Sequence, residues 1–176
     1  AAPGRVLGTA FTLRVAAVAA SLALTFATFA MLPGKASATY LDVGTASLAM
    51  VALPLLVLDP FFQSSSRSRV ITVCGLTAGV LAAVIKVFGV VSDATVTLFL
   101  AANAAESMLL GAGLIAAYEL TGNGIRRWRF DPVMARALVR EAAPTILVAF
   151  AIMIYTQSDV LLLGLLTSER EVGIYS

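Results

Sequence analysis

The sequence predicts an all-α, polytopic membrane protein whose chain crosses the bilayer five times. Its composition is 60% hydrophobic and only 12% charged, whereas charged residues make up roughly a quarter of an ordinary soluble domain. Five apolar segments have about the 20 residues that a helix needs to cross a hydrocarbon core. These segments are too long and too uniformly apolar for spanning strands, so their backbones must form helices.

The first four expected spans follow closely on one another, and a polar stretch separates them from the fifth. Residues Ala1 to Arg14 are expected to form a loop that leads into the first span. Pro33 and Gly34 should end that span, because proline lacks a backbone donor and glycine permits a turn. The absence of a starting methionine and the new helix that begins near the end indicate a piece of a longer protein. The five segments are Val15–Leu32, Val43–Phe62, Val70–Val91, Ala94–Tyr118 and Ala142–Leu166.

Local signals predict how the second, third and fourth spans begin and bend. Asp42 is expected to cap the second span, and Pro54 should bend that span. The connection Ser92-Asp93 is so short that the third and fourth spans must form an antiparallel hairpin, with Asp93 available as the cap of the fourth.

Small residues in the third span predict close helix packing. Gly75 and Gly79 have GxxxG spacing, and Ala82 and Ala83 follow. Such a face lets another helix approach closely.

The polar stretch 119–141 is expected to be a linker on the membrane surface. Asp131 followed by Pro132 has the form of a helix cap and a first helical residue. In the turns that follow, Arg136 and Arg140 lie away from the apolar face, as in a helix that rests on a membrane. That face consists of Val133, Met134, Ala137 and Leu138.

The basic residues predict the orientation of the chain. If the N-terminal end is cytoplasmic, nine of the twelve basic residues fall inside and only Lys35 and Arg170 fall outside, with Lys86 within a span. This agrees with the excess of Lys and Arg in cytoplasmic loops. The cluster Arg126 to Arg129 is explained by orientation alone, with a site for lipid headgroups as the alternative. The nine are Arg5, Arg14, Arg67, Arg69, Arg126, Arg127, Arg129, Arg136 and Arg140.

Several kinds of site are excluded by composition. The chain has no histidine, and its single cysteine, Cys74, lies in an apolar run. Disulfides, Cys/His metal sites and histidine-based catalysis are therefore absent. We expect no catalytic residue and no metal ligand.

Three ionisable residues lie within the expected spans: Lys86, Glu106 and Asp159. A charge in hydrocarbon costs about 2.5–3.5 kcal/mol on insertion scales, so such residues indicate a functional site. Glu106 falls near mid-membrane, while Lys86 and Asp159 fall in the outer third, where they could pair or line one hydrated cavity. Asn103 and Gln157 add hydrogen-bonding groups beside the acids. The alternatives are that Lys86 snorkels to the outer surface and that either acid makes only a structural bond between helices.

The last 33 residues resemble the signature of the oligosaccharide (O-antigen type) flippases. These belong to the superfamily that also contains multidrug exporters and the lipid II flippase. Phe61-Phe62-Gln63 followed by Arg67-Ser68-Arg69 resembles an inner loop of the same family, and Lys86 also falls where the family often has lysine. Gln157 departs from the pattern, because members often have Lys or Arg there. The signature runs through Pro144, Tyr155, Asp159, Leu163-Gly164 and Glu171-Val172-Gly173-Ile174-Tyr175-Ser176.

The resemblance implies a transporter of 12–14 helices in two lobes around a central cavity. Residues 1–118 would form four helices of the N-terminal lobe, 119–141 the cytoplasmic linker, and 142–176 the first helix of the second lobe and the start of the next. The implied activity is the flipping of undecaprenyl-diphosphate-linked oligosaccharide across the cytoplasmic membrane by alternating access. No cofactor is implied beyond H⁺ or Na⁺ coupling, and no nucleic acid; the implied partners are lipid-linked glycan, the bilayer and other polysaccharide-assembly proteins.

The implied substrate site comprises one cation, two acids and two amides. Lys86 would neutralise phosphate, the amides would bond hydroxyls, and an acid would exchange a proton or ion. Three other functions stay open: a cation-coupled drug exporter, a membrane enzyme acting on lipid-linked phosphates, and a non-transporting membrane partner. The implied site residues are Lys86, Asn103, Glu106, Gln157 and Asp159.

Overall fold

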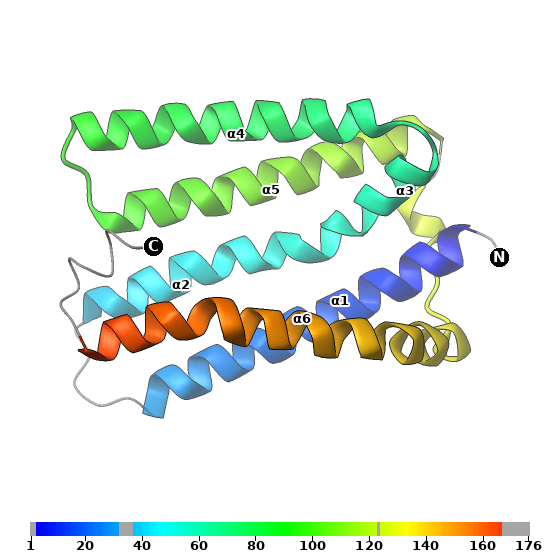
Figure 1. The fold of residues 1–176 in the computed structure, drawn as a ribbon. Coiled ribbons are helices and arrows are strands. Elements are labelled where there is room, and N and C mark those ends of the chain that lie inside the picture. Colours follow the sequence, from blue (N-terminus) through cyan, green and yellow to red (C-terminus); the bar gives the residue numbers. More distant parts are fainter. Residues whose placement is uncertain (1–2, 32–36, 123, 167–176) are drawn as a thin grey trace. The chain divides into compact units, whose positions relative to one another are not determined.

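The computed structural model describes residues 3–31, 37–122 and 124–166 (Figure 1). Side chains are described within these ranges except at 3, 37–39, 157 and 159–166. The described chain is helical, and it divides into two compact units, Ala1–Pro132 and Val133–Ser176. The elements are α1 (Pro3–Met31), α2 (Ser37–Ala52), the 3₁₀ helix η1 (Leu53–Val57), α3 (Leu58–Ser64), α4 (Ser68–Val91), α5 (Val96–Leu120), the 3₁₀ helix η2 (Ile125–Arg127) and α6 (Pro132–Leu166).

The prediction of five spanning helices is confirmed. Five helical stretches among the described residues are long and apolar enough to cross a membrane. The chain is therefore an all-α, multi-pass membrane protein. The stretches are Gly4–Met31, Tyr40–Ser64, Ser68–Val91, Val96–Leu120 and Pro132–Thr156.

The first helix begins far earlier than expected. A loop over Ala1 to Arg14 was the wrong prediction, since α1 is helical from Pro3 onward. The segment before α6 packs on these early turns: the Arg129 N–H donates to the Gly4 carbonyl oxygen at 3.3 Å. The Asp131 N–H donates to Thr9 Oγ1 at 3.0 Å. These contacts, made by residues more than 100 positions away, stabilise turns that lack any strong local helix signal.

The second span is helical throughout but changes character at its proline. Pro54 lies in η1, which joins α2 to α3 and tightens the helix where the sequence predicted a bend. Asp42 is not a cap, because α2 begins five residues before it, at Ser37. Its Oδ1 instead accepts a 2.7 Å hydrogen bond from Thr97 Oγ1 of α5. The carboxylate thus joins two helices rather than ending one.

The α4–α5 hairpin has the predicted topology, with a different role for Asp93. This residue has φ of 49° and ends α4, since the Ala94 N–H donates to the Gly89 carbonyl at 2.9 Å and the Asp93 N–H to Val90. That pattern is a Schellman ending. Helix α5 starts after Thr95, so the prediction of Asp93 as its cap is wrong.

Small residues do pack α4 closely, Ala82 among them as predicted, but Gly75 of the GxxxG pair takes no part in the contact. Ala78 and Ala82 are 3% and 2% exposed. A Cβ at Gly89 would meet the side chains of Leu98 and Phe99 on α5, whereas one at Gly75 would meet open space. The contact face therefore begins beyond Gly75 and continues past the predicted residues to Gly89.

A second Schellman ending provides a stability test. Ser66 follows α3 with φ of 55°, and the Arg67 N–H donates to the Phe62 carbonyl at 2.8 Å. Because glycine has no Cβ penalty in this conformation, Ser66→Gly is expected to raise the unfolding free energy by about 1 kcal/mol. Thermal unfolding in detergent would measure it. Ser65→Gly is the matched control, since Ser65 has φ of −89° and should gain nothing; an equal gain there would contradict the explanation.

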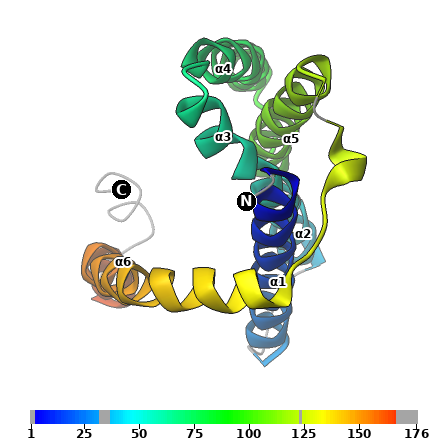
Figure 2. The same cartoon turned by 90° about the vertical axis from the view of Figure 1, so that its right-hand side faces the viewer.

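The linker helix and the fifth span form one continuous helix. Helix α6 contains Pro144 in its interior, and Figure 2 shows it change direction between its yellow first part and its orange remainder. Proline removes one backbone hydrogen bond and crowds the preceding turn, which bends a helix without ending it. The final motif residues 171–176 lie outside the described residues.

Candidate functional site

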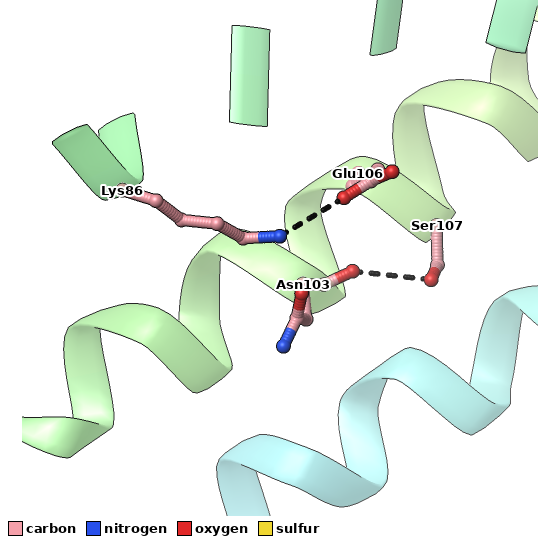
Figure 3. Close-up of polar contacts among 4 residues, drawn as sticks. All are labelled: Lys86, Asn103, Glu106 and Ser107. Carbon is pink, nitrogen blue, oxygen red and sulfur yellow. Dashed lines mark hydrogen bonds and ion pairs between the residues drawn. The ribbon is translucent and has the colours of Figure 1, made fainter. Parts of the chain in front are cut away.

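Two charged side chains of neighbouring helices meet within the membrane-spanning part of the first unit. Lys86 Nζ of α4 lies 3.3 Å from Glu106 Oε2 of α5 (Figure 3). The two side chains keep 34% and 38% of their surface exposed. The pair therefore combines a direct ionic contact with access from one side.

The pair points toward the interior of the span. Lys86 lies five residues, about 7.5 Å, from the end of α4 at Val91, and Glu106 lies ten residues, about 15 Å, from the start of α5 at Val96. The ammonium thus reaches away from the nearer membrane surface to meet the deeper carboxylate. The alternative in which Lys86 snorkels outward does not occur in this structure.

Helix packing makes room for the acid. Gly79 of α4 faces Glu106, and a Cβ placed on it would lie 3.7 Å from Glu106 Oε1. This is ordinary van der Waals distance, so the carboxylate lies near Gly79 with room left for a methyl group between them. Gly79, predicted as a packing residue, borders the ion pair.

Polar groups continue along α5 from the pair. Asn103 lies one turn before Glu106, and its side chain is exposed beside Lys86 in Figure 3. Its backbone carbonyl accepts a 3.1 Å hydrogen bond from Ser107 Oγ. The amide therefore stays available for a ligand that reaches the pair.

The Lys86–Glu106 pair is partly exposed in the middle of an apolar helix surface. The exposed side chains of α4 on either side are apolar, among them Val84, Val87 and Phe88. A half-exposed ion pair facing lipid would carry a desolvation cost of several kcal/mol. The exposed side of Lys86 and Glu106 must therefore face protein or water, as the wall of a hydrated cavity does.

The remaining predicted site residues belong to the second unit. Gln157 and Asp159 lie in α6, and their side chains are outside the described residues. Their part in a common site with the pair therefore stays a prediction. The partner of Lys86 in the first unit is Glu106, a pairing that sequence reasoning missed. The short turn at Ser92-Asp93 could have indicated this pairing, because it places α4 and α5 side by side. Lys86 and Glu106 are nevertheless out of step by about five positions along the two helices, and their two long side chains span that gap.

Sequence reasoning also missed a docking site for the segment 124–131. Cβ atoms placed on Gly4 and Gly8 would lie 2.8 Å from the Arg127 oxygen and 2.6 Å from the Arg129 nitrogen. The two glycines, four residues apart, thus form a seat for the backbone of the linker. Gly4 and Gly8 thus form a second GxxxG pattern, besides the one in the third span.

An aromatic cluster completes this docking. Trp128 packs on Phe11 of α1 at a ring distance of 5.2 Å. It packs on Tyr118 of α5 at 5.8 Å, and its Nε1 donates to the Tyr118 hydroxyl at 3.2 Å. Tyr118 belongs to the buried core of the unit, together with Leu7, Val57, Leu58, Phe62 and Leu114. The segment 124–131 is therefore fixed to α1 and α5 of the first unit.

Among the side chains that the structure describes, no three Cys, Asp or Glu residues gather in a way that could hold a metal ion. The arrangement available for chemistry is an ion pair with neighbouring hydrogen-bonding groups. Such a site can bind and exchange charged groups.

Comparison with known proteins identifies the family. The family described as "Polysaccharide biosynthesis protein" matches residues 7–176, nearly the whole chain. No curated protein and no solved structure matches the sequence. The family and the five spanning helices indicate polysaccharide export, and a transporter rather than an enzyme. The chain belongs to the polysaccharide biosynthesis protein family.

Proposed function

We propose that the protein flips an undecaprenyl-diphosphate-linked oligosaccharide from the inner to the outer leaflet of the cytoplasmic membrane by alternating access, with its N-terminal end cytoplasmic. The observation that carries the proposal is the half-exposed Lys86–Glu106 pair deep in the first unit. A sugar-diphosphate headgroup cannot cross about 30 Å of hydrocarbon unaided. A cation held at depth beside hydrogen-bonding groups supplies what the headgroup loses when it leaves water.

The pair would act by exchange of partners. Without substrate, Glu106 neutralises Lys86 and keeps the cation from being buried alone. A diphosphate carries more negative charge than one carboxylate and competes for the ammonium. Glu106 then loses its partner, and its freed carboxylate would exchange a proton or ion. Substrate binding and the exchange of H⁺ or Na⁺ would in this way be coupled.

The amides and the second acid would complete the site. Asn103 lies exposed next to the pair and would bond glycan hydroxyls. Gln157 would do the same from α6, and Asp159 would offer a second exchangeable carboxylate. These roles follow from side-chain chemistry and from the resemblance of the α6 motif to that of oligosaccharide flippases.

The ion pair also bears on the competing exporter of cationic drugs. An exporter of cations needs a carboxylate free to receive them. In this structure Glu106 is already neutralised by Lys86 at 3.3 Å, so an anionic substrate fits the site better than a cationic one.

The test is complementation with the full-length protein in a strain that lacks its own glycan flippase. We expect lipid-linked glycan to reach the outer leaflet, measured by its accessibility to an added glycan-cleaving or ligating enzyme. A strain with inserted, stable protein but no outward glycan would overturn the proposal. Resistance to cationic drugs in the same strain would instead support the drug exporter.

A further inference from the structure

The docked linker gathers arginines from two distant parts of the sequence. Backbone contacts place residues 127 and 129 against Gly4 and Gly8, on the first turns of α1. All of the arginines around this contact are exposed, and we call them the cationic patch: Arg5, Arg126, Arg127 and Arg129.

Helix length places this patch at the level of the lipid headgroups. Helix α1 has 29 residues and is about 43 Å long, whereas the hydrocarbon core measures about 30 Å. About nine residues must therefore project beyond the core. The projecting turns are those that carry Arg5 and seat the linker, because the opposite end of α1 is apolar up to Met31.

The charges of the patch are not neutralised within the described chain. None of the four guanidinium groups has a described carboxylate within 4.0 Å. An acid near the patch in sequence, Glu119, is used locally, since its Oε1 accepts a 2.9 Å hydrogen bond from the Ile125 N–H. Four arginines held at fixed positions thus keep their capacity for anionic partners.

The docking of segment 124–131 on α1 distinguishes this patch from basic residues in flexible loops, whose only role is to set the orientation of the chain in the membrane. The Trp128 ring is held between Phe11 and Tyr118, so the backbone that carries the arginines on either side of it needs no ordering when they bind. Guanidinium groups on such a backbone at headgroup depth suit bidentate contacts with phosphate. The patch also has a built-in reporter, because Trp128 is the only tryptophan of the chain.

We propose that the cationic patch binds the headgroups of anionic phospholipids in the leaflet that borders the linker. Each arginine at an anionic surface contributes about a factor of five in affinity. The bound lipids form a shell around the linker, so membrane composition regulates how firmly the linker lies on the bilayer. The proposal does not depend on the transported substrate.

The experiment measures which lipid lies next to Trp128. The full-length protein, with any tryptophan outside residues 1–176 replaced by phenylalanine so that Trp128 alone reports, is reconstituted into bilayers of phosphatidylcholine and phosphatidylglycerol, with one or the other lipid brominated. Bromine quenches nearby tryptophan, so the ratio of the two quenching curves gives the relative lipid affinity at this position. We expect at least a fivefold preference for phosphatidylglycerol, falling toward one at 1 M salt, where the Debye length is about 3 Å.

Variants test whether the lipid preference comes from the cationic patch or from positive charge anywhere on the same side of the protein. Arg5→Gln, Arg126→Gln, Arg127→Gln and Arg129→Gln together should remove the preference, whereas the control Arg67→Gln with Arg69→Gln, in the α3–α4 connection, should keep it. The variant with lysine at the same four positions should retain most of the preference, and it keeps the proposal testable if the glutamine variant fails to fold. Equal quenching by both lipids in the unmodified protein would overturn the proposal, as would a preference that salt does not reduce.

Discussion

Lys86→Ala in the full-length protein is expected to lower glycan export by at least tenfold. The change removes the cation that pairs with the acid of α5, and it leaves Glu106 without its 3.3 Å partner. A hydrogen bond to a charged group contributes about 1.5–3 kcal/mol, which corresponds to a tenfold to hundredfold effect on substrate binding. Lys86→Arg should retain most of the activity. Export is measured as outer-leaflet lipid-linked glycan at matched protein levels.

A charge swap separates a substrate role from a structural one. Lys86→Glu with Glu106→Lys keeps an ion pair between α4 and α5 but places the cation deeper in the span. If the pair is only structural, the double variant should export normally. We expect the double variant to regain the stability that either single substitution removes, but not to export glycan.

Glu106→Gln is expected to keep substrate binding and to lose the pH dependence of transport. A pH profile unchanged by Glu106→Gln would contradict proton coupling at this site.

Gly8→Ala is expected to lower the unfolding free energy by about 3 kcal/mol, the upper range for overpacking. A Cβ at this position would lie 2.6 Å from the Arg129 nitrogen and 2.7 Å from its oxygen, and backbone atoms cannot move aside as a flexible side chain can. The linker would leave its seat on α1, and the Trp128 ring would become more exposed. Unfolding in detergent and a red shift of Trp128 emission would measure both effects.

Gly75→Ala is the matched control for this change. It is also a glycine within a spanning helix, but a Cβ there meets open space, so the substitution should be neutral or stabilising by up to about 1 kcal/mol. Equal losses at both positions would show that helix glycines in general, and not the linker seat, are responsible.

The spans were predictable because their signal is local. Hydrocarbon requires about 20 apolar residues and internal backbone hydrogen bonding, and both requirements can be read from any window of the chain. Pro54, the turn at Ser92-Asp93 and the arginine distribution have the same local character. The family motif around Pro144 likewise needs only neighbouring residues.

The site was predictable as a set of residue types, but its pairing was not. Lys86, Asn103 and Glu106 stand out because polar side chains in apolar runs are costly. Which acid meets Lys86 depends on the register between α4 and α5, and that register is set by Ala78, Ala82 and Gly89 against the α5 side chains. No periodicity within one helix contains this information.

The sequence by itself determined the fold class, the number of spanning helices and the family, since each depends on composition or on contiguous residues. Only the tertiary structure decided that Asp42 bonds Thr97, that α1 begins at Pro3, and that the linker docks on Gly4 and Gly8. Each of these features joins groups far apart in the chain. Their stability comes from packing and hydrogen bonds that exist only after the helices have come together, so no local pattern encodes them.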